Sequence, residues 1–142
     1  MAKKEEVRKR RLNDVDLYSI EVFLRFLIPR ARTGQTFTYT DMVELAPEQN
    51  SPRTIGRRLT WIRFFTIPRQ LPDLGSFVVT KKDNEAGYAF DKNAARERQK
   101  CRNVANWHEN EIHEFLLEMG RSKEAGLTFA DLERKYGINA LN

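Results

Sequence analysis

The chain has 142 residues, of which 40% are hydrophobic, so it suits one domain with a real core and room for an appended element. Its one cysteine, Cys101, excludes an internal disulfide and fits a reducing compartment. No apolar stretch is long enough for a signal peptide or a membrane span, so we expect a cytoplasmic protein of bacterial or phage type with no membrane partner.

The net charge of +5 is modest, but it is unevenly distributed along the chain. Residues 1–11 hold six basic side chains against two acidic ones, and residues 49–70 hold five arginines and no acid. Residues 103–142 lean acidic. A basic front and an acidic rear predict a face that binds a polyanion, and a scattered surface charge is the alternative.

The N-terminal part divides into an arm and a helix. Residues 1–13 are polar and basic with no apolar periodicity, so we expect a flexible basic arm. From Asp14, which can cap a helix, apolar residues recur at helical spacing as far as Ile28. Pro29 follows, and we expect the helix to stop before it.

A strand and two helices are predicted next. The segment 33–40 alternates and is rich in threonine and aromatic residues, which is typical of a short strand, and a short helix over 41–46 follows it. Ser51 is a good N-cap and Pro52 suits the first helical position, so a second helix should run from there to about Phe65. Two helices joined by a tight polar turn form a helix-turn-helix pattern.

The remaining segments predict a hairpin and further helices. Residues 76–80 and 88–90 are typical of strands, and the polar turn at 81–87 would join them into a β-hairpin, or wing. A helical pattern then runs from residue 91 to Gly120, with a possible break near 107–110.

One more short helix follows, between Thr128 as cap and Gly137 as stop. The predicted fold is therefore mainly α with a small β-hairpin. It consists of the flexible basic arm at 1–13, a winged helix-turn-helix domain at 14–90 and a C-terminal helical extension at 91–142.

The helix at 52–65 carries the strongest functional signal. At 100° per residue Ile55, Leu59 and Ile62 share one face, and Arg53, Arg57 and Phe64 lie on the opposite side. Arginine suits phosphates and base edges, because its planar fork donates two parallel hydrogen bonds. With the predicted wing and arm, the candidate DNA-binding residues are Arg53, Thr54, Arg57, Arg58, Thr60, Lys81, Lys82, Arg10 and Arg11.

A structural alternative remains open for these arginines. They could pair with Glu44, with Glu48 or with the acidic C-terminal helix, in which case the charged face would bind nothing.

The order of residues also resembles the DNA-binding half of the alkylguanine-DNA alkyltransferases and the alkyltransferase-like proteins. The resemblance covers roughly residues 20–90 and lies in Ile28-Pro29, "GQTFTYTD" (34–41), "PRTIGRRL" (52–59), Leu71-Pro72, Val78-Val79 and "GYA" (87–89). It implies a helix that enters the minor groove, with Arg53 propping open the base stack. Where that family has Pro-Cys-His-Arg, this chain has "PDLG" (72–75), so the resemblance does not extend to alkyl transfer.

The same segments, together with Trp107, are also similar to small bacterial winged-helix modules of no assigned chemistry. That resemblance bears on fold more than on function.

No catalytic or metal-binding motif is evident in the chain. His108 and His113 are five residues apart, whereas the helical zinc motif of metalloproteases needs a spacing of four. We therefore expect no enzyme, no cofactor and no metal. The predicted function is binding of double-stranded DNA by a non-enzymatic protein, such as a transcriptional regulator or a phage or defence accessory factor. The alternative is a protein-interaction or dimerisation scaffold whose C-terminal helices dock a protein partner or a second copy.

Overall fold

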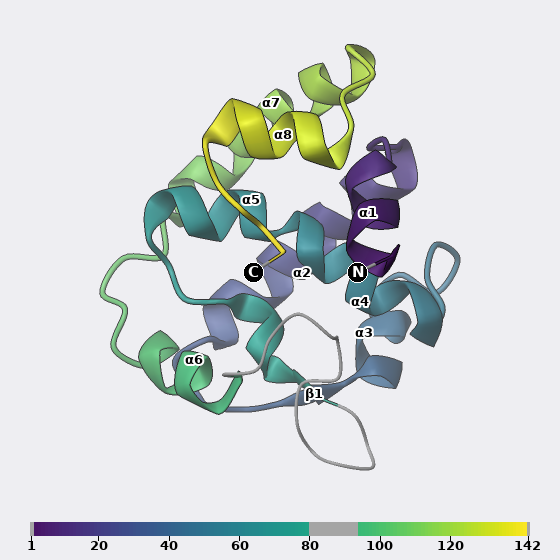
Figure 1. The fold of residues 1–142 in the computed structure, drawn as a ribbon. Helices are drawn as coiled ribbons and strands as arrows, with labels where there is room; N and C mark the ends of the chain where they lie inside the picture. Colours follow the sequence, from purple (N-terminus) through teal and green to yellow (C-terminus); the bar gives the residue numbers. More distant parts are fainter. Residues whose placement is uncertain (1, 80–93, 142) are drawn as a thin grey trace.

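The computed structural model describes residues 2–79 and 94–141, and these are mainly helical, as the sequence predicts (Figure 1). No described helix is long and apolar enough to cross a membrane. The elements in chain order are α1 (Ala2–Lys9), α2 (Asp14–Arg30), β1 (Phe37–Thr38), α3 (Tyr39–Leu45), α4 (Pro52–Trp61), α5 (Arg63–Thr66), η1 (Ile67–Arg69), η2 (Leu74–Phe77), β2 (Val78–Val79), α6 (Ala94–Cys101), η3 (Glu109–Glu111), α7 (Ile112–Glu124) and α8 (Phe129–Tyr136).

The segment predicted to be a flexible arm is a helix packed on the rest of the protein. α1 lies against α8, where Arg8 Nε donates to Glu133 Oε1 at 3.0 Å. Val7 and Leu12 are buried, and the backbone N–H of Phe129 donates to the carbonyl of Arg10 at 2.8 Å. The prediction of an arm was wrong because two apolar residues show no periodicity, while the tertiary contacts that order this segment involve the other end of the chain.

Helix α2 begins and ends slightly outside its predicted limits. Asn13, rather than Asp14, is the cap: its side chain accepts from the N–H of Asp16 at 2.8 Å, and Asp16 accepts in return from the N–H of Asn13 at 3.1 Å. At the other end the helix includes Pro29 and stops at Arg30. A proline in the last turn removes only one helical hydrogen bond, so it does not end the helix at once.

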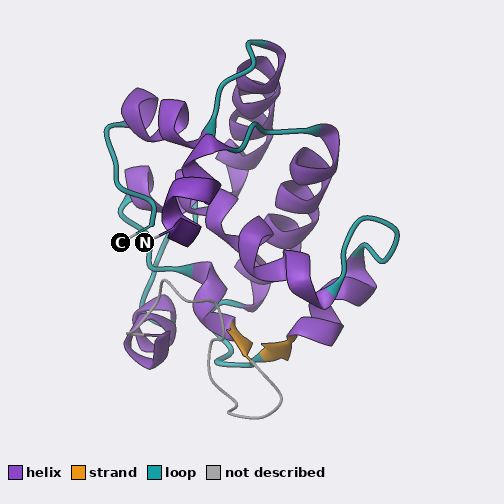
Figure 2. Cartoon of the chain, turned by 45° about the vertical axis from the view of Figure 1, so that its right-hand side comes forward, coloured by secondary structure: helices purple, strands orange, loops and turns teal. Residues whose placement is uncertain are grey.

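The small sheet is formed by two strands that are distant in sequence. β1 and β2 pair in parallel, with Phe37 opposite Val78 and Thr38 opposite Val79, and Figure 2 shows them side by side at one edge of the helices. The sequence predicted that 76–80 would instead pair with 88–90 in a hairpin. Residues 88–90 lie outside the described residues.

One predicted helix is broken in two, and another continues beyond its predicted end. The helix predicted over 52–65 breaks at Ile62 into α4 and α5. Gly120, the predicted end of the next long helix, lies within α7, and the turn falls at Gly126, whose φ of 71° is the left-handed conformation that glycine adopts readily. Thr128 and Gly137 flank α8, as predicted.

The helices share one core, including those that the sequence analysis assigned to an extension. Phe129 of α8 packs edge-on against Trp61 and Phe64, with ring centroids 4.9 and 4.8 Å away. Phe115 of α7 meets Phe65 at 5.3 Å in the same manner. Both contacts involve the stretch Trp61–Phe65, so the C-terminal helices cover the far end of α4 and α5 and leave the beginning of α4 open.

Candidate nucleic-acid interface

The turn between α3 and α4 is anchored to α2 by one buried side chain. Asn50 Nδ2 donates to the hydroxyl of Ser19 at 3.1 Å and lies 3.4 Å from the carbonyl of Ala46. The hydroxyl of Thr54 donates to Asn50 Oδ1 at 3.3 Å. Because Ser19 and Asn50 are buried, this network fixes the position of the first turn of α4 relative to the core.

Helix α4 starts in solvent. Ser51, Pro52 and Arg53 are exposed, so the free N–H groups and the positive end of the helix dipole face outward. The hydroxyl of Thr54, which the sequence analysis proposed for DNA contact, accepts from the N–H of Ser51 at 3.0 Å. Thr54 therefore stabilises the start of the helix in this structure.

Arg58 forms a buried ion pair instead of lining a surface. Its Nη1 donates to Asp16 Oδ1 at 2.5 Å, and the two side chains are only 6% and 5% exposed. Burial lowers the pKa of Arg58 and raises the pKa of Asp16, and each partner opposes the shift of the other. Thr60 is also buried and donates to the carbonyl of Arg57 at 2.6 Å. The prediction that Arg58 and Thr60 contact DNA is corrected, because neither side chain reaches the surface.

Unlike Arg58, three other arginines, Arg10, Arg53 and Arg57, reach the surface. Arg53 is exposed, and Arg57 and Arg10 are partly exposed. None of the three side chains forms a hydrogen bond or ion pair with another described residue, and Arg57 Nε is shielded from solvent without an acceptor. Burial lowers the pKa of Arg10, and the positive charge of the neighbouring Arg57 lowers it further. We call these three residues the arginine cluster.

The other predicted contact residues lie beside the cluster or outside the described chain. Arg11 is exposed, and its backbone bridges to Thr128. Lys81 and Lys82 lie outside the described residues.

The alternative pairings considered from the sequence do not occur within the described part of the chain. Neither Arg53 nor Arg57 pairs there with Glu44, with Glu48 or with α7. The partner that the sequence analysis missed is Asp16, which holds Arg58. Asp16 has a local signal, because it occupies the third position of α2, where an acidic residue supports the cap, but nothing in the sequence indicates its pairing across 42 residues.

The cysteine and the two histidines lie apart in the described structure. Cys101 is fully buried, and burial raises the pKa of its thiol to about 12, so the thiol stays protonated at neutral pH. His108 Nδ1 contacts Glu111, and His113 is exposed. Across residues 2–79 and 94–141 no group of three or more His, Cys, Asp or Glu residues could hold a metal ion.

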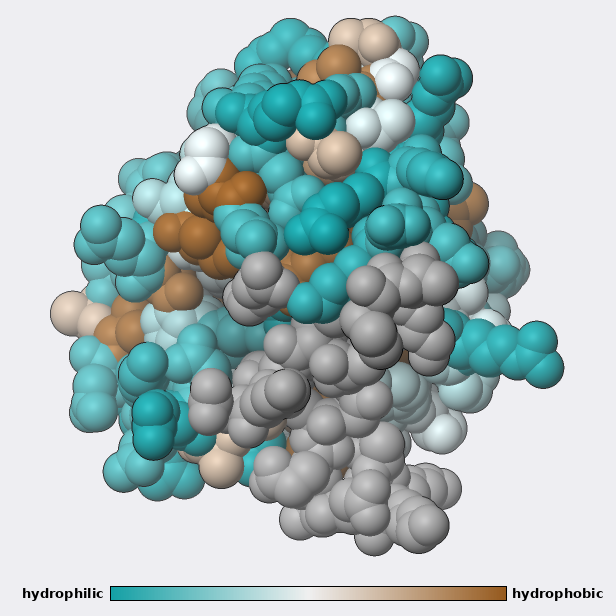
Figure 3. Space-filling view, in the orientation of Figure 1, coloured by the Kyte–Doolittle hydropathy of each residue, from teal (hydrophilic) through white to brown (hydrophobic). Residues whose placement is uncertain are grey.

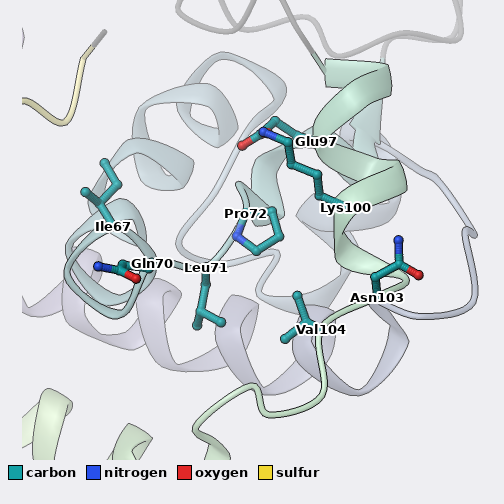
Figure 4. A pocket seen from close by; sticks show the side chains of 8 residues that line it. All are labelled: Ile67, Gln70, Leu71, Pro72, Glu97, Lys100, Asn103 and Val104. Carbon is teal, nitrogen blue, oxygen red and sulfur yellow. The ribbon is translucent and has the colours of Figure 1, made fainter.

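An open pocket of about 470 Å³ lies between the segment after α5 and helix α6 (Figure 4). On the face drawn in Figure 3, hydrophobic surface gathers over that segment, which includes Ile67 and Leu71. The charges at its rim satisfy each other: Glu97 accepts from Lys100 at 3.0 Å and from the N–H of Asp73 at 3.2 Å. The pocket therefore offers apolar contact but no unpaired charge among its lining residues.

Comparisons of the chain with models of protein families, with curated proteins and with solved structures find no match.

Proposed function

We propose that the protein binds double-stranded DNA, with α3 and α4 acting as a helix-turn-helix and the arginine cluster contacting the phosphates. The observation that carries this proposal is Arg57. Its side chain is partly exposed and forms no hydrogen bond or ion pair with a described residue, and its charge adds to the lowering of the Arg10 pKa that burial causes. A phosphate at the accessible part of the two side chains would offset the repulsion between the two cations.

The placement of the cluster supports the same conclusion. Arg53 and Arg57 are four residues apart, so they lie on one side of α4, one turn from each other. The exposed start of the helix adds free N–H groups and a favourable dipole on that side. Because Asn50 holds the turn against α2, a ligand would meet a preformed surface and little ordering cost would accompany binding. Arg11, Lys81 and Lys82 would add contacts to the backbone.

The test is a fluorescence-anisotropy titration of a random-sequence duplex at several salt concentrations. If the arginine cluster together with Arg11, Lys81 and Lys82 neutralises about six phosphates, log K should fall against log salt with a slope of about −5.4. Replacing Arg53 and Arg57 by alanine should weaken binding and flatten the slope by about 2.

Arg121→Ala, which removes an exposed arginine from α7, is the matched control and should change neither quantity. Unchanged affinity and slope in the Arg53→Ala, Arg57→Ala double variant would show that the cluster is not the binding surface.

The second candidate, a scaffold that docks a partner on the C-terminal helices, has less support. The apolar side of α7 is already used within the chain, because Phe115 and Met119 are buried in the core. Phe129 and Leu132 of α8 are fully buried as well. Apart from Leu117, which is 44% exposed on α7, the described parts of these helices therefore leave little apolar surface for a partner.

A further inference from the structure

The side of α2 opposite the buried residues Ile20 and Leu24 is apolar, although a surface helix normally carries polar residues there. Five apolar residues fall within an arc of about 80° at 100° per residue. They are Val15, Tyr18, Val22, Phe26 and Pro29, and we call them the outer stripe. The buried residues Ile20, Leu24 and Leu27 point the other way, into the core.

The outer stripe is accessible in the described structure. Tyr18 is 49% exposed and Val15 is 37% exposed, which makes them two of the most exposed large hydrophobic residues described. Pro29 is exposed, and Val22 and Phe26 are half-buried. Phe26 contacts Phe37 edge-on at 4.8 Å, and the guanidinium of Arg30 lies 4.1 Å from the centroid of its ring, so this end of the stripe is partly covered within the chain. A continuous apolar line of this kind on a helix indicates an interface.

The pattern of the stripe is symmetric about Val22. Its spacings are three, four, four and three residues, with the aromatic residues Tyr18 and Phe26 at equal distances on either side of Val22. A two-fold symmetric interface needs a surface that is complementary to itself. In an antiparallel pairing centred on Val22, Tyr18 would lie against the partner's Phe26, and Val15 against the partner's Pro29.

The charges along one edge of the stripe are also self-complementary. Glu21 and Arg25 are exposed there and pair with each other at 2.9 Å. A second, antiparallel α2 would bring its own Arg25 within about 3 Å of Glu21 along the helix axis, from the rise of 1.5 Å per residue. The edge of the pair would then hold two carboxylates flanked by two guanidinium groups, with no net charge.

From this symmetry we propose that the outer stripe of α2 is a dimer interface, occupied by α2 of a second copy of this chain in antiparallel orientation. Asp16, which holds Arg58 of α4, lies about 120° around α2 from Val22 at the centre of the stripe, so the two copies would meet on a different side of α2 from the one that carries this ion pair. The inference does not rest on DNA binding.

The experiment is sedimentation equilibrium of the whole chain without nucleic acid, from the micromolar to the submillimolar range. We expect a dimer for the natural sequence. Tyr18→Glu should raise the dissociation constant at least about a hundredfold, because a symmetric interface contains the substitution twice. Leu117→Glu is the matched control: Leu117 is 44% exposed on α7, outside the stripe, and its replacement should leave the dimer intact.

A charge-swap series tests the orientation. Glu21→Arg and Arg25→Glu should each weaken the dimer, because four like charges would gather at one edge, and the double variant should recover it. Far-UV circular dichroism checks that each exposed-site variant is folded. A natural sequence that stays monomeric throughout, a Tyr18→Glu variant that still dimerises fully, or a double variant no better than the single ones would overturn the proposal.

Discussion

Replacing Arg58 by methionine should destabilise the fold strongly, whereas the same change at the neighbouring Arg57 should not. Removing Arg58 leaves the carboxylate of Asp16 buried without its cation, and both side chains of this 2.5 Å pair are almost inaccessible to water. Losing one partner of a buried pair costs about 3–5 kcal/mol of the free energy of unfolding. Methionine keeps most of the aliphatic volume, so the loss reports the charge and not a cavity.

Arg57 has no acceptor to lose within the described chain. Its removal takes away a shielded donor without a partner and a like charge beside Arg10 and Arg58. The free energy of unfolding should therefore change by less than about 0.5 kcal/mol, or rise slightly. The two arginines are adjacent in sequence, but their variants should differ in effect. Arg58→Met should lower the free energy of unfolding, whereas Arg57→Met should lower the affinity for DNA and leave the free energy of unfolding almost unchanged.

Urea-induced unfolding at neutral pH, followed by far-UV circular dichroism, measures both effects. Combining Arg58→Met with Asp16→Asn should recover at least about 1 kcal/mol relative to Arg58→Met, because no unpaired charge stays buried and the amide still accepts from the N–H of Asn13. An Arg57→Met variant as unstable as Arg58→Met, or a double variant that recovers no stability, would show that the ion pair of Arg58 with Asp16 does not stabilise the fold.

Two further predictions concern the core. Phe129→Ala should lower the free energy of unfolding by about 3–5 kcal/mol in the same urea experiment, since the fully buried ring holds α8 on Trp61 and Phe64; a loss below about 1 kcal/mol would contradict this packing. Cys101, with its pKa raised to about 12 by burial, should react with iodoacetamide only in unfolded molecules between pH 7 and 9, so its rate should rise with urea as the unfolded fraction rises. Because the unfolded thiol ionises first, Cys101 should also make stability fall as the pH rises from about 8.5 toward 12, and Cys101→Ala should remove that part of the loss.

The sequence predicts the helices best where local signals suffice. Thr128 and Gly137 bound α8 as expected, since a hydroxyl cap and a left-handed glycine act within a few residues. Ser51 and Pro52 likewise mark the start of α4. Gly120 misled the prediction, because a glycine inside a helix costs only about 1 kcal/mol and the neighbouring residues of α7 outweigh it.

The sequence predicts the structure less well where contacts between distant segments determine it. Residues 2–9 form a helix because α8 supports it, and β1 finds its partner in β2, some forty residues later. The candidate site is affected in the same way. The helical period places Arg53 and Arg57 on the outer side of α4, but it cannot tell that Arg58, next in sequence, is held by Asp16.

The contact between α1 and α8 also has a consequence for protein synthesis. Arg8 and Glu133 are 125 positions apart, so the ribosome completes α1 long before its partner exists. At about 5–20 residues per second this delay is on the order of ten seconds. A helix of eight residues is not stable alone, so this segment of the nascent chain stays unfolded during that interval, with Val7 open to chaperones and proteases. Although it is synthesised before α8, α1 should thus be among the last segments to fold.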